Sequence, residues 1–288
     1  MKNDVLVEVD NLHVNFPTVG EHVEAVRGVS FEIRKGETLG VVGESGSGKS
    51  VTSMSMLRLN DMAGAYVPAG GIYLNSERLG RLELTALDEG TIGQIRGREI
   101  SMIFQEPMTC LNPVLDLRLQ LTEHLFQHLD MSQEEADERI LSLLRKVRIP
   151  DPEGKLNQYP HNLSGGMRQR VMIAMALACG PSLLIADEPT TALDVTIQAQ
   201  ILDLIKDIQD ELGMSVLFIT HDMAVIAEMA DRVVVMFDGK IVEQGTVEQI
   251  FHDPQHNYTK KLISAVPRIG SMNGMTAPEK FPAIVDQT

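Results

Sequence analysis

The chain has 288 residues, with 25 basic and 40 acidic side chains and a formal net charge of −15. This length allows one large α/β unit or two modest domains, and the acidic balance argues against a protein that coats nucleic acid by neutralising its phosphates. Only two cysteines, Cys110 and Cys179, are present, too few and too far apart for a disulfide framework or a metal cluster, so we expect a reducing compartment.

No uninterrupted apolar run in the sequence reaches the length of a membrane-spanning helix. The first residues, MKNDVLVEVDNLHV, lack the apolar core of a secretion signal. We therefore expect a cytosolic chain. If the protein works at a membrane, other chains must supply the membrane spans.

The N-terminal part of the chain is predicted to be rich in β-structure. Residues 5–16 (VLVEVDNLHVNF) and 26–33 (VRGVSFEI) alternate in polarity or are β-branched in the manner of strands. The turn RKGE leads from them into TLGVV at 38–42, a short apolar run typical of a buried strand.

Directly after that strand stands GESGSGKS, which is followed by VTSMSMLRL, a segment apolar at helical intervals. The pattern G-x-x-x-x-G-K-S/T wraps backbone N–H groups around a phosphate chain at the start of a helix. Gly43, Gly46 and Gly48 would let the backbone approach closely, Lys49 would neutralise the terminal phosphates, and Ser50 would place its hydroxyl on Mg²⁺. A flexible turn is the alternative, but the flanking strand and helix favour a phosphate site. The predicted nucleotide-binding residues of this segment are Gly43, Glu44, Ser45, Gly46, Ser47, Gly48, Lys49, Ser50 and Val51.

Two helices are predicted in the middle of the chain. Residues 132–147 (SQEEADERILSLLRKV) begin with Ser132 as a cap, carry acids in the first turn and bases in the last, and are apolar every three or four residues. In LSGGMRQRVMIAMALA, Ser164 and two glycines open a second long helix. That helix start also suits an anion, yet one nucleotide can use only one such start as its phosphate cradle. The spare site indicates a partner chain.

The segment SLLIAD at 182–187 is predicted to be a buried strand that ends at Asp187, with Glu188 directly after it. Asp187 is suited to holding Mg²⁺, and Glu188 can orient or deprotonate an attacking water. Adjacent acids are often only a polar strand end, but beside a phosphate loop the catalytic interpretation is preferred. SVLFIT at 215–220 is predicted to be a parallel neighbour, reached through a helix at 195–212.

The last predicted element is a hairpin at 232–245 (RVVVMFDGKIVEQG) with Asp238 and Gly239 at its turn. The tail after Pro267 is rich in Pro, Gly, Ser and Thr, and we expect it to be loosely held.

Taken together, these motifs resemble those of the ATP-binding-cassette (ABC) ATPases. GESGSGKS, LSGGMRQR, LLIADEP, TALD and FITHD stand in the order and approximate spacing of that family and cover nearly the whole chain. FQEPMTCLNPV and DPQHNYTKKLISAVP look like the ATPase subunits of oligopeptide, dipeptide and nickel importers. The resemblance implies an α/β fold with a P-loop NTPase (RecA-like) core, an N-terminal antiparallel β layer and an inserted helical signature subdomain. It places the ATPase domain at residues 1–270, the helical subdomain at about 107–180, and a tail at 271–288.

The resemblance also implies roles for single residues. Phe16 would stack on adenine, unless it is a core phenylalanine. Gln105 would touch Mg²⁺ and the attacking water, and His221 would contact the γ-phosphate. Asp194 would link the two composite sites across a dimer interface. The implied catalytic residues are Glu188, His221 and Gln105, the implied metal ligands are Ser50, Gln105 and Asp187, and the signature that would close over the partner's ATP is Leu163, Ser164, Gly165, Gly166 and Met167.

As cofactors the resemblance implies ATP and Mg²⁺. Importer ATPases of this type often carry cysteines in the C-terminal extension, but this tail has none, so no iron–sulfur cluster is expected. The sequence has HNYT where the family usually has His-Pro-Tyr-Thr, with Asn257 in place of proline. The apolar segment after Gln105 would form a notch for a short permease helix, or simply a packed helical subdomain.

The function implied is that of an ABC importer's ATPase subunit, bound at the cytoplasmic face of the inner membrane. Its partners would be a second cassette, identical or paralogous, two permease subunits and, indirectly, an extracytoplasmic solute-binding protein, with no nucleic acid. The expected cargo is a dipeptide or oligopeptide, with nickel, an opine, glutathione or an oligosaccharide as alternatives.

Two other classes of function are weighed against the importer. A soluble ABC ATPase of DNA repair or chromosome organisation would carry long coiled-coil insertions between phosphate loop and signature, and none is present. A regulatory module that binds ATP without turnover would lack the acid or the histidine, but Glu188 and His221 are both in place.

Overall fold

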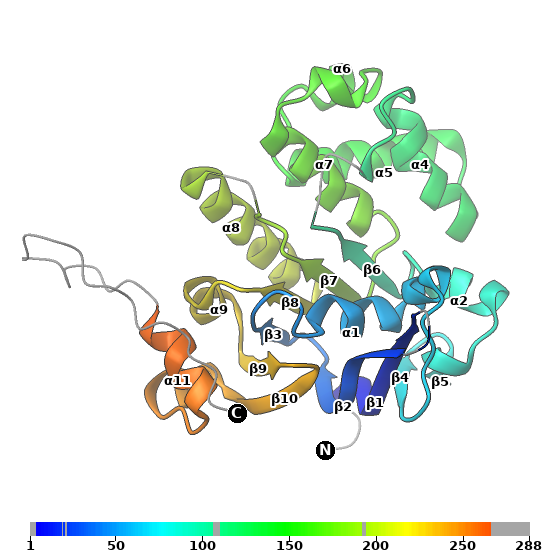
Figure 1. The fold of residues 1–288 in the computed structure, drawn as a ribbon. Coiled ribbons are helices and arrows are strands. Elements are labelled where there is room, and N and C mark those ends of the chain that lie inside the picture. The colour runs from blue at the N-terminus through cyan, green and yellow to red at the C-terminus, as the bar shows by residue number, and fades with distance from the viewer. Residues whose placement is uncertain (1–3, 19, 21, 106–109, 192–193, 266–288) are drawn as a thin grey trace, which may run out of the picture.

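The structure is a computed structural model that describes residues 4–18, 20, 22–105, 110–191 and 194–265. Two sheets and a separate group of helices build the molecule (Figure 1). The tail predicted to be loosely held lies outside the described residues, and so does the predicted domain boundary at 270/271. Residues 106–109 and 192–193, which belong to two of the predicted motifs, also lie outside them.

The smaller sheet is antiparallel and has the strand order β2-β1-β4-β5. It confirms the N-terminal β layer, because β1 and β2 contain the two predicted strands and extend them by a few residues. Buried and exposed residues alternate from Val29 to Arg34 in β2, whereas β1 also buries the adjacent pairs Leu6–Val7 and Val14–Asn15. The four strands are β1 Val5–Pro17, β2 His22–Arg34, β4 Gly71–Ser76 and β5 Gly80–Glu83.

The larger sheet has the order β10-β9-β3-β8-β7-β6. All its neighbouring strands are parallel except β9 and β10, the antiparallel pair at one edge. That pair is the predicted hairpin, with Asp238 (φ 48°) and Gly239 (φ 74°) at the turn. Because the parallel strands are in register, the carboxyl ends of β3, β7 and β8 meet at one edge. The strands are β3 Thr38–Val42, β6 Ile100–Ile103, β7 Leu183–Asp187, β8 Ser215–Thr220, β9 Arg232–Phe237 and β10 Lys240–Thr246.

The larger sheet is the middle of three layers. Along β7, Leu184 and Ala186 pack in one hydrophobic cluster with side chains of α7 and α8, whereas Leu183 and Ile185 pack in a second cluster with β1 and β2. Apolar side chains on both faces explain why the strands read as continuous hydrophobic runs in the sequence.

The helices α4 to α7 lie together at one end of the molecule, in green in Figure 1. They occupy most of the predicted signature subdomain. Ser132 caps α5 with a capping box, as its sequence predicts. The helices outside the short 3₁₀ turns are α1 Lys49–Met56, α2 Glu89–Ile95, α4 Leu117–His128, α5 Gln133–Lys146, α6 Pro152–Leu156, α7 Gly165–Leu177, α8 Val195–Leu212, α9 Met223–Met229, α10 Val247–His252 and α11 Asn257–Ser264. Of these described helices, none has the length and apolarity that a bilayer crossing requires.

Candidate functional site

The phosphate loop connects β3 to α1 at the sheet edge where the parallel strands end. The Lys49 ammonium donates hydrogen bonds to the carbonyl oxygens of Gly43 (2.8 Å) and Glu44 (2.7 Å), and a longer one to the Ser47 hydroxyl (3.4 Å). Burial lowers the pKa of Lys49, and the negative charges of Glu188, Asp187 and Glu44 oppose this effect. Ser45 and Gly46, at the tip of the loop, are exposed.

Two of the loop glycines are required by contacts within the chain. A Cβ at Gly43 would lie 2.2 Å from the carbonyl oxygen of Met236, and one at Gly48, which has φ +95°, would lie 2.6 Å from that of Ala25. The sequence motif alone explains these glycines only by close approach of the backbone to phosphate. The structure adds that the loop is pressed against β9 and β2, so a side chain there would displace the loop itself.

The carboxyl group of Asp187 is suited to an oxygen-ligated cation. It is buried at the end of β7, beside Ser50 at the start of α1, whose side chain lowers the Asp187 pKa. Its Oδ1 is buried without a hydrogen-bond partner among the described atoms. Burial and the neighbouring Glu188 raise the pKa of Asp187, against the opposing effects of Ser50 and Lys49. An orphaned carboxylate oxygen beside a hydroxyl matches the ligands that Mg²⁺ prefers.

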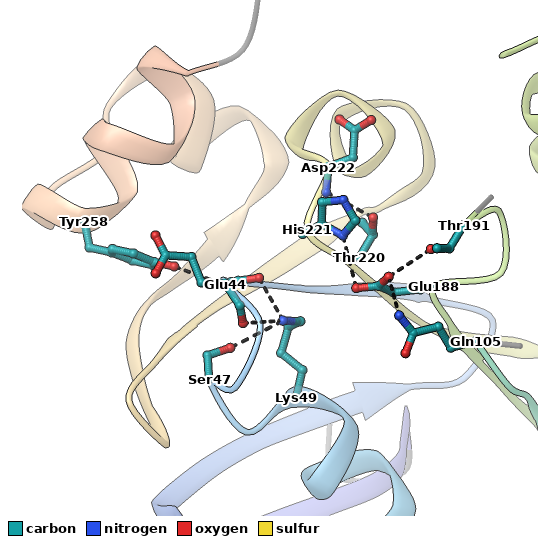
Figure 2. A network of polar contacts seen from close by, with 11 residues as sticks. Glu44, Ser47, Lys49, Gln105, Glu188, Thr191, Thr220, His221, Asp222 and Tyr258 are labelled. Atoms are coloured by element: carbon teal, nitrogen blue, oxygen red, sulfur yellow. Dashed lines mark hydrogen bonds and ion pairs between the residues drawn. The ribbon is translucent and has the colours of Figure 1, made fainter. Parts of the chain in front are cut away.

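Glu188 is the centre of a polar network (Figure 2). Its Oε2 accepts hydrogen bonds from Gln105 Nε2 (3.0 Å) and Thr191 Oγ1 (2.8 Å), and its Oε1 lies 3.1 Å from His221 Nδ1. Burial disfavours the charged form, but the contacts with His221 and Thr191 and the charge of Lys49 outweigh it, so the pKa of Glu188 is lowered. The carboxylate is therefore ionised and oriented at neutral pH.

The backbone at Glu188 has φ +47°, in the left-handed region that side chains rarely adopt. Gln169, fully buried in α7, donates a hydrogen bond from Nε2 to the carbonyl of Pro189, the next residue. Strained backbone of this kind persists where its surroundings hold it, and it is common at functional sites. The signature helix thus holds the turn that carries Glu188.

The signature stands apart from the phosphate loop of its own chain. Ser164 caps α7 by accepting a hydrogen bond from the Met167 N–H (3.3 Å), and Gly165 has open space where a Cβ would be. Leu163 and Met167 pack in the hydrophobic cluster that includes side chains of α5, α7 and α8. A side chain at Gly166 would meet Ile197 of α8. Among the described residues, no hydrogen bond or ion pair joins this segment to residues 43–51.

Three further predicted residues lie outside the network around Glu188. Asp194 caps α8 by accepting from the Ile197 N–H (3.0 Å). Phe16 pairs with Val23 near the end of β1 and packs, partly buried, against the core shared by the two sheets. Val51 packs against the same core.

Sequence reasoning missed three residues of this site: Thr191, Gln169 and Tyr258. Tyr258, from α11, accepts a hydrogen bond from the backbone N–H of Glu44 in the phosphate loop (3.0 Å). Thr191 stood beside the acids in ADEPTT and Gln169 within the signature, so both were visible as polar neighbours of motifs. The sequence carries no signal for the contact of Tyr258, which lies 214 positions from Glu44.

In the part of the chain that the structure describes, no three His, Cys, Asp or Glu side chains gather as metal ligands. The metal site suggested above accordingly rests on Asp187 and a hydroxyl. The tail to which the iron–sulfur expectation applies lies outside that part.

Comparison with known proteins gives two family matches. Residues 26–191 match the family described as ABC transporter, and residues 242–286 match the oligopeptide/dipeptide transporter C-terminal region. The chain is 53% identical over 281 residues to the glutathione import ATP-binding protein GsiA of Salmonella typhimurium, and 53% identical over 279 residues to that of Escherichia coli. These alignments cover 98% and 97% of this chain but 45% of each relative, so the chain spans about half the length of the curated relatives it matches.

Two solved structures are similar in fold. The ATP-binding cassette MJ0796, in a dimeric post-hydrolysis state bound to ADP and Pi, superimposes with a TM-score of 0.72 at 29% identity, over 84% of this chain and 99% of that one. CbiO1 from Clostridium perfringens, part of the ABC transporter complex cbiONQ, gives a TM-score of 0.72 at 25% identity, over 87% and 92% of the two chains. The similarity therefore extends over most of the fold as well as the motifs.

Proposed function

Because the chain belongs to the ABC transporter family, we propose that it binds ATP with Mg²⁺, hydrolyses it, and couples the hydrolysis to uptake of a solute through separate permease subunits. The observation that carries the proposal is the meeting of Lys49, Asp187 and Glu188 at one sheet edge, which brings together a cation for phosphate, a buried carboxyl for a metal ion and an ionised base.

Each residue supports a distinct part of the chemistry. The loop N–H groups and Lys49 bind the phosphate chain, and Ser50 and Asp187 would hold Mg²⁺, which when bound supplies positive charge to the phosphate oxygens. Glu188 orients the attacking water and accepts its proton, since its carboxylate is ionised and held by Gln105, Thr191 and His221. His221 is mostly exposed, so it is free to face the γ-phosphate.

The proposal includes a second cassette, either a paralogue or another copy of this chain. The signature offers the first backbone N–H groups of a helix and an open Gly165, and among the described residues no hydrogen bond or ion pair joins it to the phosphate loop. Such a surface suits a nucleotide bound by another subunit, in a head-to-tail pair that ATP closes and hydrolysis opens. Phe16 is proposed to stack on adenine, and Asp194 to face the partner site.

We propose a peptide as the cargo, within an importer at the cytoplasmic face of the cell membrane. The match of residues 242–286 supports the peptide-importer type, and the similarity to glutathione importers makes glutathione, itself a small peptide, the first solute to test. Nickel, an opine and an oligosaccharide are the alternatives, because the solute would not contact this chain. An extracytoplasmic binding protein would deliver it to the permeases.

The test is to purify the tagged chain from its native membranes, identify co-purifying subunits by mass spectrometry, and assay ATP turnover of the complex in liposomes. Two permeases, a second cassette, and turnover stimulated by glutathione or a short peptide with its binding protein are expected. ATP turnover in a complex without permeases would overturn the transport proposal and keep the ATPase. Stimulation of turnover by nickel or a sugar alone would show that this solute, and not a peptide, is the cargo.

A further inference from the structure

The HNYT motif near the end of the chain lies against the phosphate loop. It forms the start of α11, and Figure 2 shows Tyr258 reaching from this helix to Glu44. The Tyr258 side chain is buried and its ring packs on Phe237, with centroids 4.5 Å apart. Its hydroxyl accepts a hydrogen bond from the Glu44 backbone N–H at 3.0 Å. Helix α11 therefore contacts the phosphate loop directly.

This contact and one of the two short hydrogen bonds of Lys49 share one peptide unit. The N–H of Glu44 and the carbonyl of Gly43 belong to the same planar trans peptide, so they point in opposite directions. Tyr258 holds the N–H end, and the Lys49 ammonium binds the carbonyl end at 2.8 Å. Rotation of that plane would move the carbonyl oxygen away from the ammonium. Hydrogen bonds at the two ends of a peptide also polarise one another.

The helix that presents Tyr258 is itself anchored at its start. The carboxylate of Glu243 on β10 accepts hydrogen bonds from the backbone N–H groups of Gln255 (2.7 Å) and His256 (3.0 Å). The His256 ring accepts one from the Tyr258 N–H (3.2 Å), capping α11. These bonds fix the entry into α11, whose first helical residue is Asn257.

We propose that Tyr258 is a positioning residue for Lys49, its hydroxyl fixing the Gly43–Glu44 peptide whose carbonyl holds the ammonium at the phosphate site. This inference rests on the proposed ATP binding and extends it, because it makes α11 part of the nucleotide site. Burial raises the pKa of Tyr258 to about 12, so its hydroxyl stays neutral and keeps this bond across the working pH range.

The test compares ATP affinity of the full-length chain with that of Tyr258→Phe, which removes only the hydroxyl and keeps the ring on Phe237. Loss of one buried hydrogen bond predicts about three- to ten-fold weaker ATP binding. Tyr73→Phe is the matched control, because Tyr73 lies in β4 of the smaller sheet, whereas the phosphate loop follows β3 of the larger sheet, and its ring contact is with Arg81. Its ATP affinity should equal that of the wild type.

A double-mutant cycle separates positioning from general loosening. In a Lys49→Ala background, Tyr258→Phe should weaken the residual ATP binding no further, because the residue through which it acts is gone; additive losses would overturn the proposal. Unchanged affinity of Tyr258→Phe, with wild-type binding intact, would also overturn it while leaving the proposed function standing. Failure of the wild type to bind ATP would contradict both the positioning role of Tyr258 and the proposed function.

A measurement on the wild type covers the case in which the Phe variant does not fold. Hydrogen exchange of the Glu44 amide in the nucleotide-free chain should be slow, since Tyr258 accepts from it. Exchange as fast as that of the exposed Gly46 amide would show that the contact does not persist, and would overturn the proposal.

Discussion

Asp187 and Glu188 are adjacent in the chain, yet their carboxyl groups have pKa values shifted in opposite directions. Burial raises the pKa of Asp187, whereas hydrogen bonds from His221 and Thr191 overcome burial and lower that of Glu188. Neighbouring acids with diverging environments have separate chemical tasks. Here one carboxyl suits a cation, and the other is an ionised base.

Glu188→Gln should retain ATP binding and slow hydrolysis by about 10²- to 10⁴-fold. The amide has the size of the carboxylate but cannot accept the proton of the attacking water. Nucleotide affinity and single-turnover hydrolysis of the assembled complex measure the two effects separately. Glu138→Gln, at an exposed position of α5, is the control with unchanged turnover. Near-normal hydrolysis by the Glu188 variant would remove this residue from the role of base.

Asp187→Asn should stabilise the metal-free chain and abolish the Mg²⁺-dependent part of ATP affinity. The raised pKa means that the ionised carboxylate is less favourable in the folded than in the unfolded state. The wild type therefore loses stability, relative to the variant, as pH rises from the ordinary value of 3.8 through the raised pKa. Thermal unfolding of both chains across that range, with EDTA present, tests the sign. A pH-independent difference between them would contradict it.

Gly165→Ala separates folding from the proposed action of the signature on a partner. A Cβ at this position meets no atom of the chain within 4 Å, and alanine is the better helix former. The melting temperature should stay level or rise, and the isolated chain should bind ATP normally. Turnover of the assembled pair should fall at least ten-fold, because the methyl group would meet the partner's nucleotide. Full turnover would argue against the cross-subunit assignment.

Gln169→Met should lower kcat while leaving the KM for ATP nearly unchanged. Methionine fills a similar volume but cannot donate to Pro189, whose carbonyl follows the turn at Glu188. Because Gln169 Oε1 has no partner among the described atoms, its removal offsets part of the lost bond, and we expect about 1 kcal/mol of destabilisation. Gln94→Met, exposed on α2, is the matched control. A loss of stability with unchanged kcat would mean that Gln169 is structural only.

Much of the fold could be predicted because its signals are local. Helix α8 and strand β8 have the bounds that their hydrophobic patterns predict, and the hairpin turns at Asp238 and Gly239. The capping box of α5 was visible because its members stand three residues apart. In each case the determining residues are close in sequence, so periodicity and turn chemistry suffice.

The site was predictable only as far as its motifs extend. That Gln105, Thr191 and His221 all contact one carboxylate depends on strand register, which no single segment contains. The requirement for glycine at position 43 comes from the Met236 carbonyl, almost 200 residues away. Contacts of this kind follow from the assembled topology, so sequence reasoning found the residues and missed how they hold each other.

The strand order also determines when the nucleotide site can form. Strand β3, which delivers the phosphate loop, pairs with β8 and β9, and both neighbours come from the last third of the chain. During synthesis, both edges of β3 therefore stay unpaired until the ribosome has added residues 43 to 214 and the strands that follow them. Tyr258 is added later still. Such long-range pairing is slow and leaves a template for aggregation. ATP, as a ligand of the finished site, can therefore stabilise this chain only after β8 and β9 have been synthesised.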